Sequence, residues 1–99
     1  MAGPHKKMIA GKPKIDNVAM PTAATEYSYA VPVETNKILL KLRSTTSSFQ
    51  LSYVAGETGT NYVTIGAGSA KTIDELKGGM TIYFQSPDPD QVMEIETWK

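Results

Sequence analysis

Most of the chain alternates hydrophobic and polar residues with a period of two. Ile38, Leu40 and Leu42 follow this period, with Leu39 as the one apolar residue that we place on the outer face. This period is typical of a strand that buries one of its faces. The same pattern predicts five further strands, at residues 27–31, 49–53, 61–65, 80–85 and 92–98.

Turn-forming residues separate these strands at intervals of roughly 8–12 residues, the spacing of a β-sandwich or barrel. Residues 71–76 fit either a seventh strand or one helical turn capped by Thr72, with Glu75 at the capping-box position. No stretch is long enough for a helical crossover, so we expect antiparallel sheets. We predict an all-β fold, a small antiparallel β-sandwich, jelly-roll-like or immunoglobulin-like, of six to seven or so strands. Residues 80–85 and 92–98 are the best candidates for a hairpin.

Residues 1–24 have a different composition from the rest of the chain. Three prolines and two glycines within them argue against a helix or a central strand. Their four lysines and one acid give a net charge of +3, whereas residues 25–99 carry −3. We therefore predict an extended basic N-terminal arm over 1–24 and a β-sandwich domain over 25–99.

Two interpretations of the arm remain open. It is either a flexible terminus, which a start at Met20 would make dispensable, or a segment that becomes ordered on a partner. In the second case its lysines would face acidic groups and its apolar residues would occupy shallow pockets. The candidate binding residues are Lys6, Lys7, Met8, Ile9, Lys12, Lys14, Ile15 and Val18.

Composition argues against most enzyme classes. The chain has no cysteine and a single histidine, His5, which removes thiol nucleophiles and cysteine zinc sites and makes histidine triads improbable. Asp88 and Asp90 lie in a proline-rich turn that lacks the other ligands of a calcium loop. We expect no catalytic residues, no cofactor and no metal. The zero net charge and the lack of a long apolar run argue against nucleic-acid and membrane partners.

The aromatic residues fall into two groups by strand face. Tyr27, Tyr29 and Tyr53 share faces with core residues, so we predict that they point inward. Three further aromatic residues share faces with polar residues and are our candidates for a subunit interface, where tyrosine and tryptophan are enriched. These candidates are Tyr62, Tyr83 and Trp98.

About three quarters of the chain resembles small β-rich virion structural proteins of tailed bacteriophages. The stretches that carry the resemblance are residues 25–29, 54–60, 62–69, 80–87 and 92–98, together with Pro32. The resemblance implies a virion protein, and the lack of a signal-like apolar run leads us to expect synthesis in the host cytoplasm.

We expect a capsid decoration (cement) protein on the outer capsid surface, which binds and bridges major capsid subunits and forms a homotrimer or homodimer. The alternative is a tail or fibre module that binds a host-surface glycan, with Trp98, Glu94 and Glu96 as its candidate platform.

Overall fold

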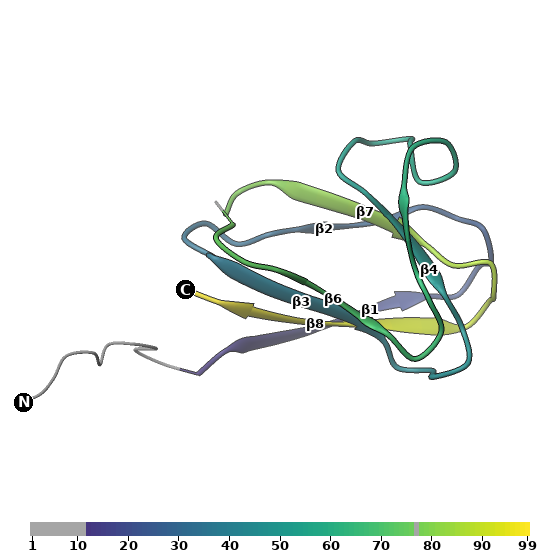
Figure 1. Ribbon diagram of the computed structural model, residues 1–99, viewed down its shortest axis with the longest axis horizontal. Helices are drawn as coiled ribbons and strands as arrows, with labels where there is room; N and C mark the ends of the chain where they lie inside the picture. The colour runs from purple at the N-terminus through teal and green to yellow at the C-terminus, as the bar shows by residue number, and fades with distance from the viewer. Residues whose placement is uncertain (1–11, 77) are drawn as a thin grey trace, which may run out of the picture.

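Eight short strands form two antiparallel sheets that pack face to face (Figure 1). The computed structural model describes residues 12–76 and 78–99. Sheet A has the strand order β1-β8-β3-β6, and sheet B has the order β2-β7-β4-β5. The strands of sheet A are β1 (Lys14–Met20), β3 (Lys37–Leu42), β6 (Ala70–Ile73) and β8 (Gln91–Trp98). Those of sheet B are β2 (Tyr27–Ala30), β4 (Phe49–Ser52), β5 (Val63–Ile65) and β7 (Thr81–Gln85).

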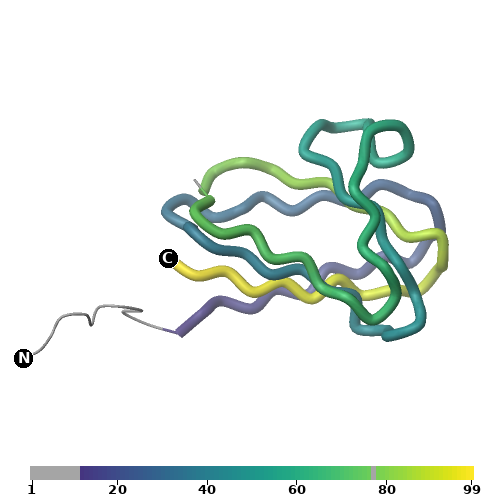
Figure 2. The backbone as a smooth tube through the Cα atoms, viewed as in Figure 1, coloured from purple at the N-terminus to yellow at the C-terminus, as the bar shows by residue number. Residues whose placement is uncertain are grey.

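The first four strands pair antiparallel with the last four, and this double strand is folded over to form the two sheets. The chain turns back on itself between β4 and β5, and the strands then pair β4 with β5, β3 with β6, β2 with β7 and β1 with β8. The pairs β3–β8 and β4–β7 complete the two sheets. Consequently β4 and β5 are consecutive strands in one sheet, whereas the other connections between described strands pass from one sheet to the other. Figure 2 shows these crossings.

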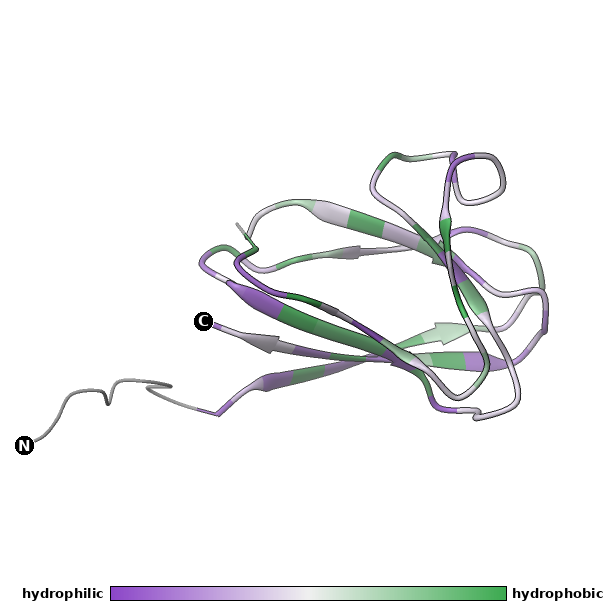
Figure 3. Cartoon of the chain, viewed as in Figure 1, coloured by the Kyte–Doolittle hydropathy of each residue, from purple (hydrophilic) through white to green (hydrophobic). Residues whose placement is uncertain are grey.

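The core lies between the sheets and follows from the period-two pattern. Figure 3 shows hydrophobic and polar residues alternating along strands such as β7, whereas the middle of β3 is hydrophobic throughout. The twelve buried hydrophobic residues come from both sheets and their connections, and each contributes roughly 1.5–3 kcal/mol by leaving water. They are Met20, Val31, Ile38, Leu40, Leu42, Phe49, Leu51, Ile65, Ile82, Phe84, Met93 and Ile95. The predicted all-β antiparallel sandwich is confirmed, with eight strands rather than six or seven.

The sandwich begins eleven residues before the predicted start of the domain at residue 25, because β1 lies within the predicted arm. Pro13 and Pro21 flank this strand instead of interrupting it, so the number of prolines is a misleading signal here. β1 is an edge strand that pairs with β8 on one side only. Its last residue, Met20, is only 1% exposed. A start at Met20 would therefore remove part of the fold, and residues 1–11 lie outside the described residues.

One other local prediction is wrong, and one open alternative is decided. Strands β7 and β8 do not form a hairpin, because β7 lies in sheet B and β8 in sheet A, and the proline-rich turn between them carries the chain across the sandwich. Residues 70–73 form strand β6 rather than a helical turn. A segment this short cannot nucleate a helix on its own, whereas pairing with β3 satisfies its backbone groups.

The connection from β6 to β7 passes closely over the turn between β2 and β3. Leu76 N donates to the Asn36 carbonyl at 2.8 Å, and Gly79 N donates to the Val31 carbonyl at 3.0 Å. At Gly78 a Cβ atom would clash with the Pro32 carbonyl oxygen and lie 2.7 Å from Thr35 N. Only glycine therefore fits this crossing without moving the backbone.

Candidate interaction surfaces

The three predicted interface aromatics lie in separate places. Trp98 is on the outer face of sheet A, and Tyr83 is on the outer face of sheet B. Tyr62 is 44% exposed in the connection between β4 and β5. Because the outer faces of a sandwich point in opposite directions, one flat interface cannot contain both Trp98 and Tyr83.

The predicted inward tyrosines have mixed outcomes. Tyr27 and Tyr29 pack against the core, which confirms the prediction for these two. Tyr53 is 45% exposed, so its prediction is wrong. Strand β4 ends at Ser52, and the strand alternation that would have turned Tyr53 inward stops there.

The outer face of sheet A carries a shallow hollow of about 270 Å³. The strand register builds it in rows, because Glu96 of β8 faces Ile15 of β1 on one side and Leu39 of β3 on the other. Ile15 is 63% exposed. We call this surface the sheet A hollow, and it is lined by Ile15, Asn17, Leu39, Lys41, Arg43, Glu94, Ile95 and Glu96.

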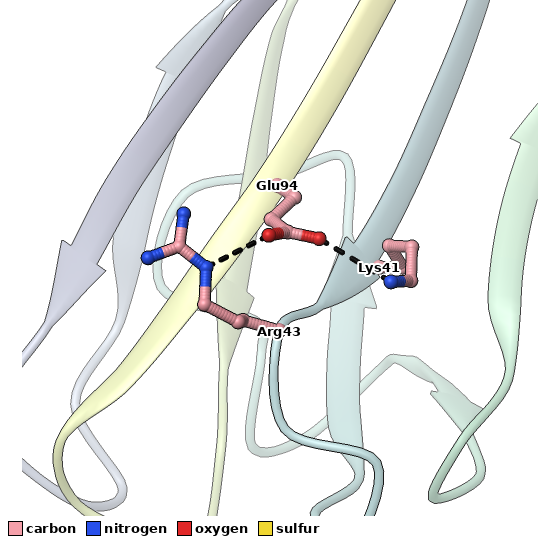
Figure 4. Close-up of polar contacts among 3 residues, drawn as sticks. All are labelled: Lys41, Arg43 and Glu94. Carbon is pink, nitrogen blue, oxygen red and sulfur yellow. Dashed lines mark hydrogen bonds and ion pairs between the residues drawn. The ribbon is translucent and has the colours of Figure 1, made fainter.

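One carboxylate in the sheet A hollow is held by two cations. Arg43 Nε donates to Glu94 Oε2 at 2.8 Å, and Lys41 Nζ donates to Glu94 Oε1 at 3.3 Å (Figure 4). The hydrogen bond from Arg43, followed by that from Lys41, lowers the pKa of Glu94 below its usual value. Both carboxylate oxygens are thus engaged, and Glu94 acts here as the centre of an ion-pair network.

Trp98 is also engaged by a neighbouring side chain. Lys37 Nζ lies over the indole ring, 5.2 Å from its centroid, in the geometry of a cation–π contact. The same ammonium lies 3.9 Å from Asp74 Oδ1. With a cation against the Trp98 ring and two cations on Glu94, the structure does not favour Trp98, Glu94 and Glu96 as a sugar-stacking platform.

The predicted arm residues within the described range divide between surface and core. Lys12, Lys14 and Ile15 are exposed, whereas Val18 packs against the core and holds β1 in the fold. Lys14 Nζ lies 3.5 Å from Asp16 Oδ2, and that oxygen accepts a hydrogen bond from the Tyr29 hydroxyl at 2.6 Å. Burial and this hydrogen bond raise the pKa of Tyr29 above its usual range. Lys6, Lys7, Met8 and Ile9 lie outside the described residues.

A second hollow, of about 180 Å³, lies at the connection between β4 and β5. Four exposed hydrophobic residues surround it, in two Tyr-Val pairs on either side of the turn: Tyr53, Val54, Tyr62 and Val63. We call this site the tip hollow; Leu51, Ser52, Glu57 and Asn61 complete its lining. Sequence reasoning misses it because the glycines of residues 54–60 indicate only a turn, although the repeated Tyr-Val pair is a usable signal.

A single carboxylate holds the loop that forms the tip hollow. Glu26 Oε2 accepts a hydrogen bond from Gly56 N at 2.9 Å, and Glu26 Oε1 accepts one from the Thr58 hydroxyl at 2.8 Å. Thr58 Oγ1 also lies 2.9 Å from Gln85 Oε1 on β7. The bond from Gly56, with smaller contributions from Thr58, lowers the pKa of Glu26 below its usual value despite partial desolvation. We call this arrangement the Glu26 clamp.

Asp88, one of the two acidic residues of the proline-rich turn, makes a contact that serves the fold. Asp88 Oδ2 accepts a hydrogen bond from the Ser47 hydroxyl at 2.8 Å and so joins two connections at one end of the sandwich. Within residues 12–76 and 78–99, no group of three or more His, Asp or Glu side chains is placed to hold a metal ion. The same residues include no helix that is long and apolar enough to cross a membrane.

Comparison with known proteins gives no relative. No protein-family model matches the chain, and no curated protein matches it significantly.

Proposed function

We propose that the chain is a phage virion structural protein, a capsid decoration protein that docks on major capsid subunits from the outside of the head. The observation that carries the proposal is the position of the sheet A hollow. It lies beside β1, the strand that follows the basic N-terminal segment. The exposed Lys14 of β1 therefore lies at the same edge of the molecule as this half-apolar surface.

The strand order supports a jelly-roll class for the sandwich. A chain folded as a rolled double strand, with four strands in each sheet, matches the double-sheet jelly rolls used by viral capsid proteins and lectins. A fold of this kind hosts several functions, so it supports the proposal only by analogy. The specific argument comes from the surface.

The sheet A hollow suits a protein partner better than a small ligand. It is shallow, and exposed apolar groups such as Ile15 lie next to charges that are already paired, such as Glu94 with Arg43. A capsid surface with apolar patches and acidic side chains would cover Ile15 and Leu39 and attract the lysines that precede β1. Lys12 and Lys14 are exposed at this edge.

Oligomerisation would add affinity to each contact. A homotrimer or homodimer presents several sheet A hollows at once, and simultaneous engagement of linked sites raises overall affinity by avidity. When several weak contacts hold one oligomer at the same time, the oligomer dissociates slowly from the particle.

The first test is the copy number of the chain in purified particles, measured by quantitative mass spectrometry against the major capsid protein. A ratio near one, or a simple fraction of one, is expected for a lattice decoration. A ratio of a few per cent would contradict the decoration role and indicate a tail or vertex component. Absence from particles would overturn the proposal entirely.

The second test separates the sheet A hollow from the rest of the surface. Ile15→Asp places a charge in the hollow, and we expect it to reduce binding to capsid shells that lack the protein. Val33→Asp is the matched control, because Val33 is 74% exposed in the turn between β2 and β3 and lies outside both hollows. Equal binding by the two variants, with both folded, would rule out the hollow as the docking surface.

A further inference from the structure

We infer that the tip hollow is a binding site for a single pyranose ring of a carbohydrate. Two tyrosines, a carboxylate and a carboxamide converge there on a small open cavity. The site uses none of the residues of the sheet A hollow. Figure 1 shows the connection between β4 and β5 projecting beyond sheet B, on the side away from sheet A. A protein docked through sheet A would therefore leave this site free.

The apolar part of the site fits the C–H face of a sugar. Tyr53 and Tyr62 are 45% and 44% exposed in the same cavity, with valine side chains beside them. Exposed tyrosines with a polar tip offer a flat surface and a hydroxyl for hydrogen bonding. A tyrosine hydroxyl is protonated at neutral pH and can donate, and burial raises the pKa of Tyr53 further above that range.

The polar part of the site fits neighbouring hydroxyl groups. Asn61 Nδ2 donates to Glu57 Oε1 at 3.3 Å, so the two side chains lie together at the edge of the cavity. Paired in this way they can offer acceptors and a donor to adjacent hydroxyls on one ring. A pyranose carries such vicinal hydroxyls around an apolar face, and this combination of groups is its chemical signature.

The loop is held in one conformation before any ligand arrives. The Glu26 clamp fixes Gly56 and Thr58, and Asn61 N donates to the Glu57 carbonyl at 2.9 Å. A preorganised loop loses less conformational entropy on binding than a flexible one. The clamp thus positions Glu57 and Asn61 without contacting the proposed ligand.

The lining of the tip hollow, with two tyrosines beside a carboxylate and a carboxamide, favours a sugar ring over a protein partner, and the size of the hollow is compatible with one ring. At about 180 Å³ it is smaller than the ~300–1,000 Å³ of drug-sized sites, which suits one ring. A stable interface between two copies needs roughly 800 Å² from each side, more area than a patch of four exposed hydrophobic side chains provides. We therefore commit to a carbohydrate and leave self-association as an outcome of the test.

The test is NMR titration of residues 1–99 with free methyl pyranosides of glucose, galactose, mannose, N-acetylglucosamine and rhamnose. We expect at least one to shift the ring signals of Tyr53 and Tyr62 and the amide of Asn61, with a Kd of about 1–10 mM. Trp98 lies on the opposite side of the sandwich and serves as an internal control. Its indole signal should not move.

Variants sharpen the assignment. Tyr62→Ala should weaken binding by about tenfold or more, and Asn61→Ala should weaken it by a similar factor. Tyr83→Ala, on the outer face of sheet B, is the matched control and should bind normally. Each variant is first checked for an unchanged amide spectrum away from its site, so that loss of the fold is not counted as loss of the ligand.

Three results would overturn the inference. The first is no shift with any pyranoside up to about 100 mM, well above the expected Kd. The second is binding that survives Tyr62→Ala. The third is a concentration-dependent dimer that Tyr62→Ala dissolves in the absence of sugar binding, which would make the tip hollow a contact between copies. Because the capsid tests use other residues, failure of either proposal can be told from failure of the other.

Discussion

The two sheets of the sandwich share one core but carry their surface features in different ways. Sheet A has the longer strands, of 7, 8, 6 and 4 residues, whereas those of sheet B have 4, 5, 4 and 3. The hollow of sheet A is built from side chains on paired strands. The tip hollow beside sheet B is built by a loop that the Glu26 clamp holds in place.

This difference determines how each surface should respond to change. Strand register places Ile15, Glu96 and Leu39 side by side, so the sheet A hollow persists as long as the strands pair. The tip hollow is formed by a loop, and the Glu26 carboxylate accepts two of the hydrogen bonds that hold this loop. One substitution outside the hollow can therefore disturb its shape, whereas the backbone of the sheet A hollow changes only with loss of a strand.

Truncation of the N-terminal segment should give the largest effect and tests the role of β1. Removing residues 1–11 leaves β1 in place, and we expect the unfolding midpoint to stay nearly unchanged. Removing residues 1–19 takes away most of β1, including Val18, and costs about 3 kcal/mol or more in buried contacts. A loss of 1 kcal/mol lowers the midpoint of a domain this size by about 4–8 °C. Equal midpoints by calorimetry would show that β1 does not stabilise the sandwich.

Much of the fold can be predicted from the sequence because alternation determines which residues face inward. Ile38, Ile82 and Ile95 are all buried as their strands require. Alternation does not say which strands pair, so it suggests a hairpin of residues 80–85 and 92–98 although these lie in different sheets. β1 is missed when only the number of prolines in residues 1–24 is considered. What matters is that the seven residues between Pro13 and Pro21 contain no proline and can form a strand.

The candidate sites are less predictable than the fold. The outward position of Trp98 follows from its strand, but the cation over its ring depends on the register between β3 and β8. The Glu26 clamp joins residues 30 and 32 positions apart, and local patterns carry no information about such contacts. The tip hollow is hidden from the pattern because Tyr53 lies one position beyond the end of its strand.

The next largest loss of stability is expected at Gly78, where the connection from β6 to β7 passes over the turn between β2 and β3. Gly78→Ala forces a Cβ against the Pro32 carbonyl oxygen and Thr35 N, and we expect a loss of about 1–3 kcal/mol in unfolding free energy by urea titration. Gly66→Ala is the control, because a Cβ added at Gly66 would meet no heavy atom within 4 Å. If both variants are equally stable, the two connections can move apart to accept a Cβ at residue 78 and glycine is not required there.

Removal of the clamp should have a smaller and more local effect. Glu26→Ala leaves Gly56 N and the Thr58 hydroxyl without their acceptor, and we expect a loss of about 1 kcal/mol with faster hydrogen exchange confined to residues 54–62. Unchanged exchange at Gly56 and Thr58 would mean that the loop holds its shape without the carboxylate.

The clamp should also respond to pH. The folded-state pKa of Glu26 is below its usual value of 4.5, so its stabilisation is present above that pH and is lost as the pH falls through the folded-state pKa. Glu94 shifts in the same direction, so global stability falls in the same range. Amide exchange at Gly56, compared with Glu26→Gln, isolates the clamp: the wild-type protein should lose protection on acidification and the variant should change little.

The smallest effect is expected at the ion-pair network of sheet A. Glu94→Gln removes the charge shared by Arg43 and Lys41, and exposed pairs of this kind contribute no more than about 1 kcal/mol. The difference in unfolding free energy should shrink at high salt. A loss as large as that of Gly78→Ala would show that the sheet A surface depends on single residues after all.

The pairing of β1 with β8 also has a consequence for synthesis. Lys14 is opposite Thr97, so β1 leaves the ribosome long before the strand against which it will pair exists. At about 5–20 residues per second, that interval lasts several seconds. During this time the basic N-terminal segment and the edge of β1 are unprotected, and a nascent chain that met another copy could exchange this strand with it. Completion of β8 is therefore the step that commits each chain to its own sandwich.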